Sequence, residues 1–228
     1  MKVAIIISLL LTLAGTSVLA LDKAELDARI RRITAKLESM QEKGADKRIP
    51  AETLQKARGI ILLDRTKAGF IFAYQGGSGV GMVRDAKSGV WSPVAFYEAN
   101  EASLGFQIGG QKTFMVILLM NNETTRLLTE PNTNFGGEAS GTAGDSKAVA
   151  EGNVAPTTPG VLVYDERQGL YGGAAIKGGA ISPDNEANLK YYGEPLTVKE
   201  ILFDHKAKAT PAATELAGKI NTLAKGSK

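Results

Sequence analysis

The sequence has no cysteine and only one histidine, His205, among its 228 residues. Without cysteine the chain can form no disulfide, and it has neither a thiol nucleophile nor a thiolate metal ligand. One histidine is too few for a typical transition-metal site. It also lies far along the chain from Ser78, the serine of the motif Gly77-Ser78-Gly79, so a catalytic triad of serine, histidine and aspartate is not expected. We therefore expect no metal and no cofactor.

A large excess of charge of one sign is also missing. The chain carries 27 Lys and Arg against 24 Asp and Glu, which gives a formal net charge of +3. Loss of an N-terminal leader containing Lys2 would lower this charge by one. Nucleic-acid-binding proteins usually carry a strongly basic surface, so we expect no nucleic-acid partner.

A long apolar run occurs at the N-terminus alone. Two residues, the second of them Lys2, precede the apolar run 3–14, and Val18 and Ala20 occupy the small-residue positions of a cleavage site. This pattern is typical of a secretory signal peptide, and the run is shorter than the roughly 20 residues that span a bilayer. We expect cleavage of residues 1–20 rather than a membrane anchor. The mature protein is then exported, periplasmic or extracellular, and either soluble or peripheral on a membrane.

The spacing of apolar residues predicts helices at both ends of the chain and strands between them. Residues 22–43 and 210–224 each repeat apolar residues at a four-three spacing, which gives one stripe along a helix. Between them the period changes to two, with short turns that favour antiparallel pairing. We predict an α+β fold in which a twisted, glycine-rich, mostly antiparallel sheet is packed with N-terminal and C-terminal helices.

Shorter elements complete this prediction. The expected strands are 60–63, 70–74, 80–82, 90–96, 104–108, 113–120, 161–164 and 170–176. Short helices are expected at 50–58, 122–128, 183–191 and 197–203, the last opened by a capping box of Thr197 and Glu200. The small-residue stretch 130–160 is expected to be mobile or partly a strand with a loop. The corresponding division is a helical segment 21–56, a β-rich domain 57–203 and a helical extension 204–228.

Glycines are densest in GFIFAYQGGSGVGMVR, residues 69–84. A phosphate-binding glycine loop needs a helix directly after it, whereas the alternation of a strand follows here. The dinucleotide pattern fails because Met82 or Arg84 stands where glycine is required, and the nucleophile elbow fails at Val80. We expect a hairpin whose small residues permit positive φ and close backbone approach. Such a bare surface would admit a packed helix or a flat or anionic ligand.

Five short motifs, in this order, resemble the SYLF lipid-binding domain family over roughly residues 57–203. They are Ala57-Arg58-Gly59-Ile60, Lys67-Ala68-Gly69-Phe70, Trp91-Ser92-Pro93-Val94-Ala95-Phe96, Gly105-Phe106-Gln107-Ile108-Gly109 and Asn188-Leu189-Lys190-Tyr191-Tyr192-Gly193. The resemblance implies a noncatalytic domain that binds membrane lipids, phosphoinositides in eukaryotic relatives. The chain lacks the family's Gly-Pro motif at 144–147 and its basic segment at 165–168, so only an anionic lipid is carried over.

Two sets of residues are candidates for this contact. Lys67, Arg84 and Lys112, with Arg65 as a weaker addition, flank the glycine-rich strands and are expected to bind headgroups. A membrane contact is also considered for Arg29, Arg32 and Lys36 beside the stripe of the first helix, and for Trp91 as an aromatic anchor. The alternatives are a first helix packed on the sheet and a tryptophan in the core.

Two other functions stay open. In the first, the chain is a structural or protein-interaction module of the cell envelope whose terminal helices pair between copies, which gives a homo-oligomer. In the second, paired carboxylates form a hydrolytic site, for which Glu98 with Glu101 and Glu138 with Asp145 are the candidates. No spacing singles these carboxylates out, and we expect the protein not to be an enzyme.

Overall fold

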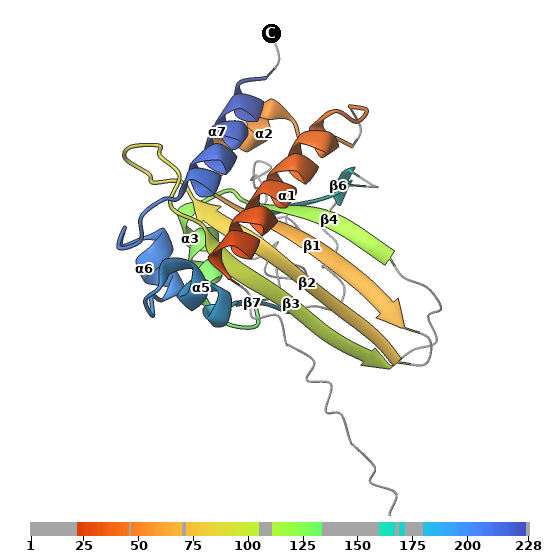
Figure 1. Ribbon diagram of the computed structural model, residues 1–228. Helices are drawn as coiled ribbons and strands as arrows, with labels where there is room; N and C mark the ends of the chain where they lie inside the picture. The colour runs from red at the N-terminus through yellow and green to blue at the C-terminus, as the bar shows by residue number, and fades with distance from the viewer. Residues whose placement is uncertain are drawn as a thin grey trace, which may run out of the picture.

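A computed structural model describes residues 22–45, 47–69, 72–104, 111–133, 160–166, 169–171 and 180–226. The expected signal peptide and most of the stretch 130–160 lie outside these residues. Within them the chain forms one sheet with helices on both of its faces (Figure 1).

The sheet has seven strands in the order β6-β5-β4-β1-β2-β3-β7, and every neighbouring pair is antiparallel. The predicted α+β class with a mostly antiparallel sheet is therefore confirmed. The strands are β1 (Gly59–Gly69), β2 (Phe72–Val83), β3 (Ala95–Leu104), β4 (Gln111–Leu119), β5 (Val161–Asp165), β6 (Gly169–Tyr171) and β7 (Ala180–Pro183).

Two strand predictions are wrong. The glycines of residues 76–81 form no hairpin turn but lie inside the continuous strand β2, and none of them has a positive φ. The expected strand 90–96 is not formed, because Pro93 has no N–H to donate to a ladder. Trp91 makes only an isolated bridge to Arg84, and β3 begins at Ala95 and runs on through Glu98.

The helices are α1 (Lys23–Gln41), α2 (Ala51–Lys56), α3 (Asn122–Arg126), α5 (Asn185–Tyr192), α6 (Val198–Leu202) and α7 (Pro211–Lys225), with a 3-10 turn η1 (Leu127–Thr129). The capping box of Thr197 and Glu200 is confirmed at the start of α6. The predicted helix 122–128 begins after Asn121, whose side chain accepts a hydrogen bond from the Thr124 N–H.

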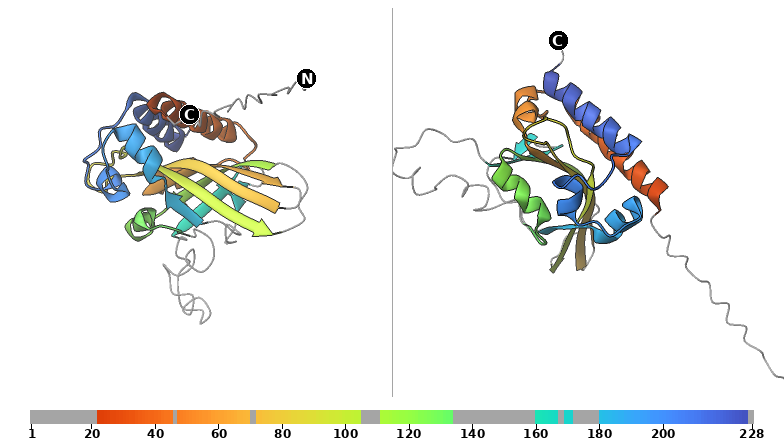
Figure 2. Two further views of the ribbon diagram at one scale, coloured as in Figure 1. Left: turned by 60° about the horizontal axis from the view of Figure 1, so that its bottom comes forward. Right: turned by 90° about the vertical axis from the view of Figure 1, so that its left-hand side faces the viewer.

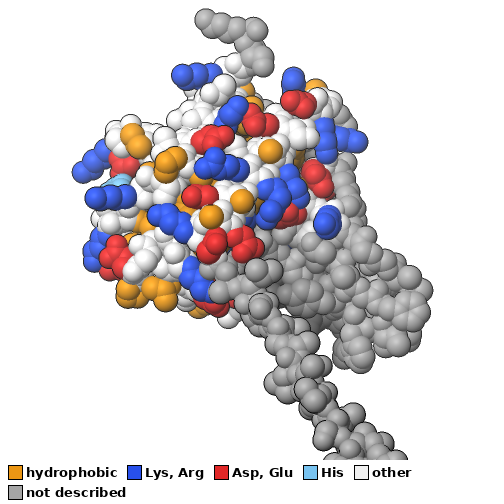
Figure 3. Space-filling view, in the orientation of Figure 1, with side chains coloured by type: hydrophobic (Ala, Val, Ile, Leu, Met, Phe, Trp, Pro, Cys, Tyr) orange, Lys and Arg blue, Asp and Glu red, His pale blue; other side chains and the backbone are white. Residues whose placement is uncertain are grey.

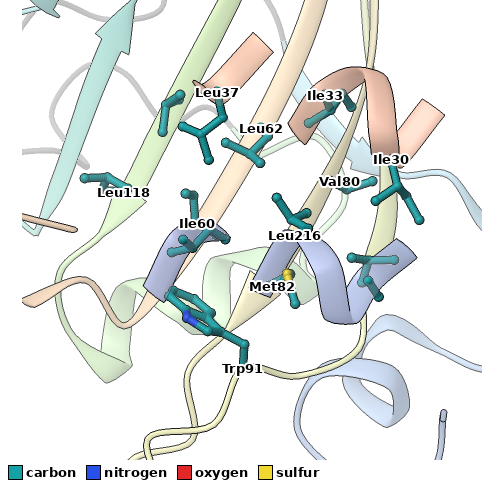
Figure 4. Packing of buried hydrophobic residues seen from close by; sticks show 14 of the residues in the cluster. Ile30, Ile33, Leu37, Ile60, Leu62, Val80, Met82, Trp91, Leu118 and Leu216 are labelled. Carbon is teal, nitrogen blue, oxygen red and sulfur yellow. The ribbon is translucent and has the colours of Figure 1, made fainter. Parts of the chain in front are cut away.

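The sheet separates two apolar layers. On one face, Ile60 and Leu62 of β1 pack with α1, α2, α5 and α7, and Figure 4 shows Leu216 of α7 among these residues. On the other face, Ile61 and Leu63 pack with η1 and α6. Figure 2 shows α1 and α7 side by side over one face and α3 on the opposite side of the sheet. Residues 60–63 of β1 are therefore covered on both faces by the chain itself.

Candidate functional site

The glycines of β2 serve strand packing. An atom placed at the Cβ position of Gly79 would lie 2.3 Å from the backbone oxygen of Leu62, and one at Gly81 would lie 2.7 Å from the Tyr97 ring. The Tyr97 hydroxyl donates a hydrogen bond to the Leu128 carbonyl, and complete burial raises the pKa of this phenol. The space that the glycines leave is thus filled by β1 and Tyr97. The prediction of an open surface for a ligand is therefore wrong at Gly79 and Gly81.

The four predicted headgroup ligands do not form one site. The register places Lys67 opposite Gln75, whereas Arg84 follows Val83 at the other end of β2. At about 3.3 Å per residue, Lys67 and Arg84 are about 30 Å apart along the strand. These two cations are therefore too far apart to contact one lipid headgroup.

The remaining two members of that set lie on opposite faces of the sheet. Lys112 pairs with Thr66 and is exposed, on the face that carries α1. Arg65 shares the face of Leu63 and is 8% exposed, with its Nη1 3.7 Å from the Met115 sulfur. Arg65 is therefore a buried residue and not a surface ligand.

Arg84 forms hydrogen bonds with three separate segments of the chain: α2, the turn after β2, and α7. Its guanidinium donates hydrogen bonds to the carbonyls of Gln55 (2.8 Å) and Gly89 (3.1 Å) and to the Asn221 side chain (3.1 Å). It also lies 5.3 Å from the centre of the Trp91 ring. These contacts give Arg84 a structural role, and its replacement would change stability together with any lipid contact.

Trp91 belongs to the core. It is 6% exposed and lies among the packed apolar side chains in Figure 4. Its indole N–H donates to Asn221 of α7. The interpretation as a membrane anchor is therefore wrong, and the alternative of a core tryptophan describes the structure.

The apolar stripe of α1 is buried on the sheet, with Leu26, Ile30, Ile33 and Leu37 fully covered. Two of its candidate membrane cations are paired with residues below the helix. Lys36 contacts Asp64 at 2.7 Å, and Arg29 lies 3.8 Å from Asp184, where partial burial lowers the pKa of the guanidinium. Arg32 is exposed. The alternative that this helix packs on the sheet is the one that the structure shows.

A group of exposed cations gathers where α2 and the end of α7 meet. We call it the basic end, and its members are Lys47, Arg48, Lys56, Arg58 and Lys225. Gly226 lies against Ala51, which brings the end of α7 to the start of α2. Blue side chains stand at this upper margin of the molecule in Figure 3. Acidic Glu52 lies among them, and Glu42 follows α1 nearby in the chain.

The basic end groups cations that have no ion pair within the described part of the chain. None of its five cations forms an ion pair with a residue that the structure describes. Elsewhere seven cations pair with carboxylates: Arg29, Lys36, Lys43, Lys190, Lys199, Lys206 and Lys219. Other exposed cations without an ion pair among the described residues, such as Lys87, Arg126 and Lys208, are spread over the surface. A cavity of about 630 Å³ opens at the basic end between Arg48, Glu52 and Leu223. The arrangement favours contact with an extended anionic surface.

Sequence reasoning missed this group, although a signal was available. Residues 47–58 read KRIPAETLQKAR and hold four cations against one acid, Glu52. The prediction instead favoured Lys67, Arg84 and Lys112, which flank the glycine-rich strands. Gly79 and Gly81 of these strands serve packing.

The described residues contain no group of three or more His, Asp or Glu side chains that could hold a metal ion. Of the carboxylates considered for hydrolysis, Glu98 lies on β3. Glu101, Glu138 and Asp145 lie outside the residues whose side chains are described. None of the described helices is long and apolar enough to cross a membrane.

Comparison with known proteins identifies relatives. A family model, Ysc84, described as "Las17-binding protein actin regulator", matches residues 100–223. Protein YSC84 of Saccharomyces cerevisiae is 36% identical over 177 residues, which cover 76% of this chain and 37% of the relative. The human SH3 domain-containing YSC84-like protein 1 is 32% identical over 162 residues, 70% of this chain and 47% of the relative.

The chain thus spans less than half the length of these relatives. No solved structure matches it. The family match covers more than half of the sequence and agrees with the resemblance that the five short motifs indicate. The chain therefore belongs to the Ysc84/SYLF family.

Proposed function

We propose that this domain is a noncatalytic module that attaches to the anionic lipid surface of a cell-envelope membrane through its basic end. The observation that carries the proposal is the grouping of unpaired cations at the basic end. Five exposed cations without ion-pair partners in the described structure lie where α2 and the end of α7 meet, with Glu52 as the acidic residue among them.

The physics of such a contact is that of a peripheral protein. Each Lys or Arg near an anionic membrane surface contributes about 1 kcal/mol, so five cations would give a few kcal/mol. Part of this is offset by Glu52. Because charges interact over a Debye length of about 10 Å at 0.1 M salt, binding should weaken as salt is added. The proposed attachment is reversible and selective for charge.

A protein-interaction module is the alternative. It is supported by the family description, which names Las17 binding and actin regulation for the family. A basic surface could also meet an acidic protein. The apolar stripes of α1 and α7, which we expected to pair between copies, are buried together within one chain. A homo-oligomer stays a prediction for which no surface is assigned.

Liposome flotation with two matched triple variants tests the proposal. The first variant is Lys47→Glu, Arg48→Glu and Arg58→Glu at the basic end. The control is Arg31→Glu, Arg32→Glu and Lys208→Glu, which reverses three exposed cations elsewhere. Vesicles of phosphatidylglycerol and phosphatidylcholine are compared with phosphatidylcholine alone. We expect the first variant to lose at least about tenfold in binding to anionic vesicles and the control to bind like the unmodified chain.

Thermal unfolding of both variants checks that each is folded. The proposal fails if the unmodified chain ignores anionic lipid, and this result would favour a protein partner. Loss of binding in the control alone would move the contact to the exposed face of α1. Equal binding by all three proteins would exclude the basic end as the contact.

A further inference from the structure

A second cavity lies on the other face of the sheet, between the turn after β2, the α3–η1 segment and α6. Its volume is about 560 Å³, within the range of small-molecule pockets. Its lining residues come from segments distant in sequence, and one of them, Arg84, also hydrogen-bonds to Asn221 of α7.

The floor of this cavity is apolar and its rim is charged. Val83 and Leu202 are 5% and 1% exposed, and Phe203 stands partly exposed beside them. Arg126 at the end of α3 and His205 after α6 line the rim and are exposed. An apolar floor under cationic or hydrogen-bonding groups suits a molecule with one apolar and one anionic part.

Most polar groups of the lining already have partners within the chain. One Asp85 carboxylate oxygen accepts hydrogen bonds from the Lys87 N–H and from both the N–H and the hydroxyl of Ser88. The Thr129 hydroxyl donates to the Arg126 carbonyl, and Lys199 is paired with Asp204.

Among the described residues, the Arg126 guanidinium, the His205 ring and the Asn122 amide have no side-chain hydrogen bond within the chain. Glu130 is the lining carboxylate without one. In the whole lining three cations, Arg84, Arg126 and Lys199, stand against two carboxylates, Asp85 and Glu130, and the His205 ring adds an N–H donor. This imbalance favours an oxyanion.

The backbone of His205 adds an independent observation. Its φ is 55°, in the left-handed region that residues other than glycine seldom occupy. Such conformations cost free energy and concentrate at functional sites, because the surrounding structure must hold them. Here the conformation sets the only histidine of the chain at the rim of the cavity.

We propose that this cavity binds a small amphipathic oxyanion, a carboxylate or phosphate carried on a short apolar body. The apolar part lies on Val83, Leu202 and Phe203, and the oxyanion accepts hydrogen bonds from Arg126 and His205. This site goes beyond the proposed membrane contact and does not depend on it, since it takes a single molecule in solution.

Isothermal titration with soluble probes tests this inference. The probes are hexanoate, dihexanoyl phosphatidate below its micelle concentration, and inorganic phosphate. We expect one of the two amphiphiles to bind, and which of them binds identifies the source of the oxyanion. Inorganic phosphate should bind more weakly, because it leaves the apolar floor uncovered. Arg126→Gln should weaken the bound amphiphile at least about tenfold, as expected for one charge-assisted hydrogen bond.

Arg31→Gln on the exposed face of α1 is the matched control and should leave the affinity unchanged. Thermal unfolding shows whether the Arg126→Gln protein is folded. Failure of both amphiphiles to bind overturns the inference. It is also overturned if phosphate binds as tightly as they do, or if Arg126→Gln binds normally. Because no vesicle is used, none of these results depends on the liposome experiment.

Discussion

Gly79 and Gly81 lie in β2 where a side chain would meet a neighbouring strand or ring. At Gly79 the obstacle is a backbone carbonyl of β1, which cannot rotate away as a side chain could. At Gly81 it is the buried Tyr97 ring. The absence of a Cβ at these positions therefore determines how closely β2 approaches its neighbours.

We predict that Gly79→Ala destabilises the protein by about 1–3 kcal/mol, because the new methyl group overpacks against β1. Gly218→Ala is the control. Gly218 is exposed in α7 with nothing within 4 Å of the Cβ position, and alanine there should raise the free energy of unfolding by about 0.5–1 kcal/mol. Urea denaturation measures both changes. Equal stability of Gly79→Ala and the unmodified chain would contradict the packing account.

The sequence predicts where charged residues are concentrated, but not which of them are paired in the fold. The cations of residues 47–58 are visible as a local excess of charge in the sequence. The pairing of Lys36 with Asp64 is not, since it joins α1 to β1 across the fold. Arg84 and Trp91 were predicted to contact lipid, but both donate hydrogen bonds to Asn221. Asn221 lies 130 or more residues later in the sequence, so a local pattern does not indicate this contact. Which charges are free is therefore decided by tertiary contacts.

Among the secondary-structure elements, α6 is short and depends on its ends. Thr197 and Glu200 bond reciprocally at its start, and Lys206 reaches back to Glu200 at 2.7 Å. The hydrogen bond from Lys206, with those from Thr197, lowers the pKa of Glu200 to about 2. Because α6 carries Leu202 and precedes His205, this capping also positions one wall of the second cavity.

The lowered pKa of Glu200 predicts that this residue contributes to stability in a pH-dependent way. A carboxylate with a depressed folded pKa stabilises the protein above its unfolded pKa and loses this effect as the pH falls through the folded value. Between about pH 5 and about pH 2, the unmodified chain should therefore lose more stability than Glu200→Gln does. Urea denaturation across this range measures the difference. Glu194→Gln, which removes an exposed carboxylate with no side-chain hydrogen bond in the described structure, should behave like the unmodified chain.

Helices were predicted more accurately than strands. The four-three spacing of α1 and α7 is a strong signal because one stripe must face the sheet. The strands β2 and β3 were misread because glycines and small polar residues interrupt the alternation expected of a strand. The continuity of β2 comes from its partners, since Gly76 to Gly81 pair with β1 on one side and β3 on the other. Hydrogen bonding to neighbouring strands cannot be predicted from the local sequence pattern of β2.

Across the fold, Tyr191 joins the helices that cover one face of the sheet. Its hydroxyl donates to Asp27 of α1 at 2.6 Å and contacts the Thr210 hydroxyl at the cap of α7. Its ring meets Phe96 of β3 edge-on, with centroids 4.9 Å apart. Desolvation and the neighbouring Asp27 raise the pKa of this phenol, so it stays protonated as a donor.

We predict that Tyr191→Phe lowers the free energy of unfolding by about 1–3 kcal/mol, because it leaves a partly buried carboxylate without its donor. The same change made in an Asp27→Ala background should cost less, since the partner is already absent. Urea denaturation of the four proteins completes this cycle. Additive effects would show that Tyr191 and Asp27 do not act together.

The helices α1 and α7 come from opposite ends of the sequence and cover the same face of the sheet. The apolar side chains of β1 on that face can be sealed only when residues 211–225 are available, about 150 residues after β1 is made. Contacts this distant in sequence slow folding. A chain emerging from the ribosome therefore cannot complete the cover of Ile60, Leu62 and Trp91 until α7 is made, and apolar surface left open in this interval favours aggregation.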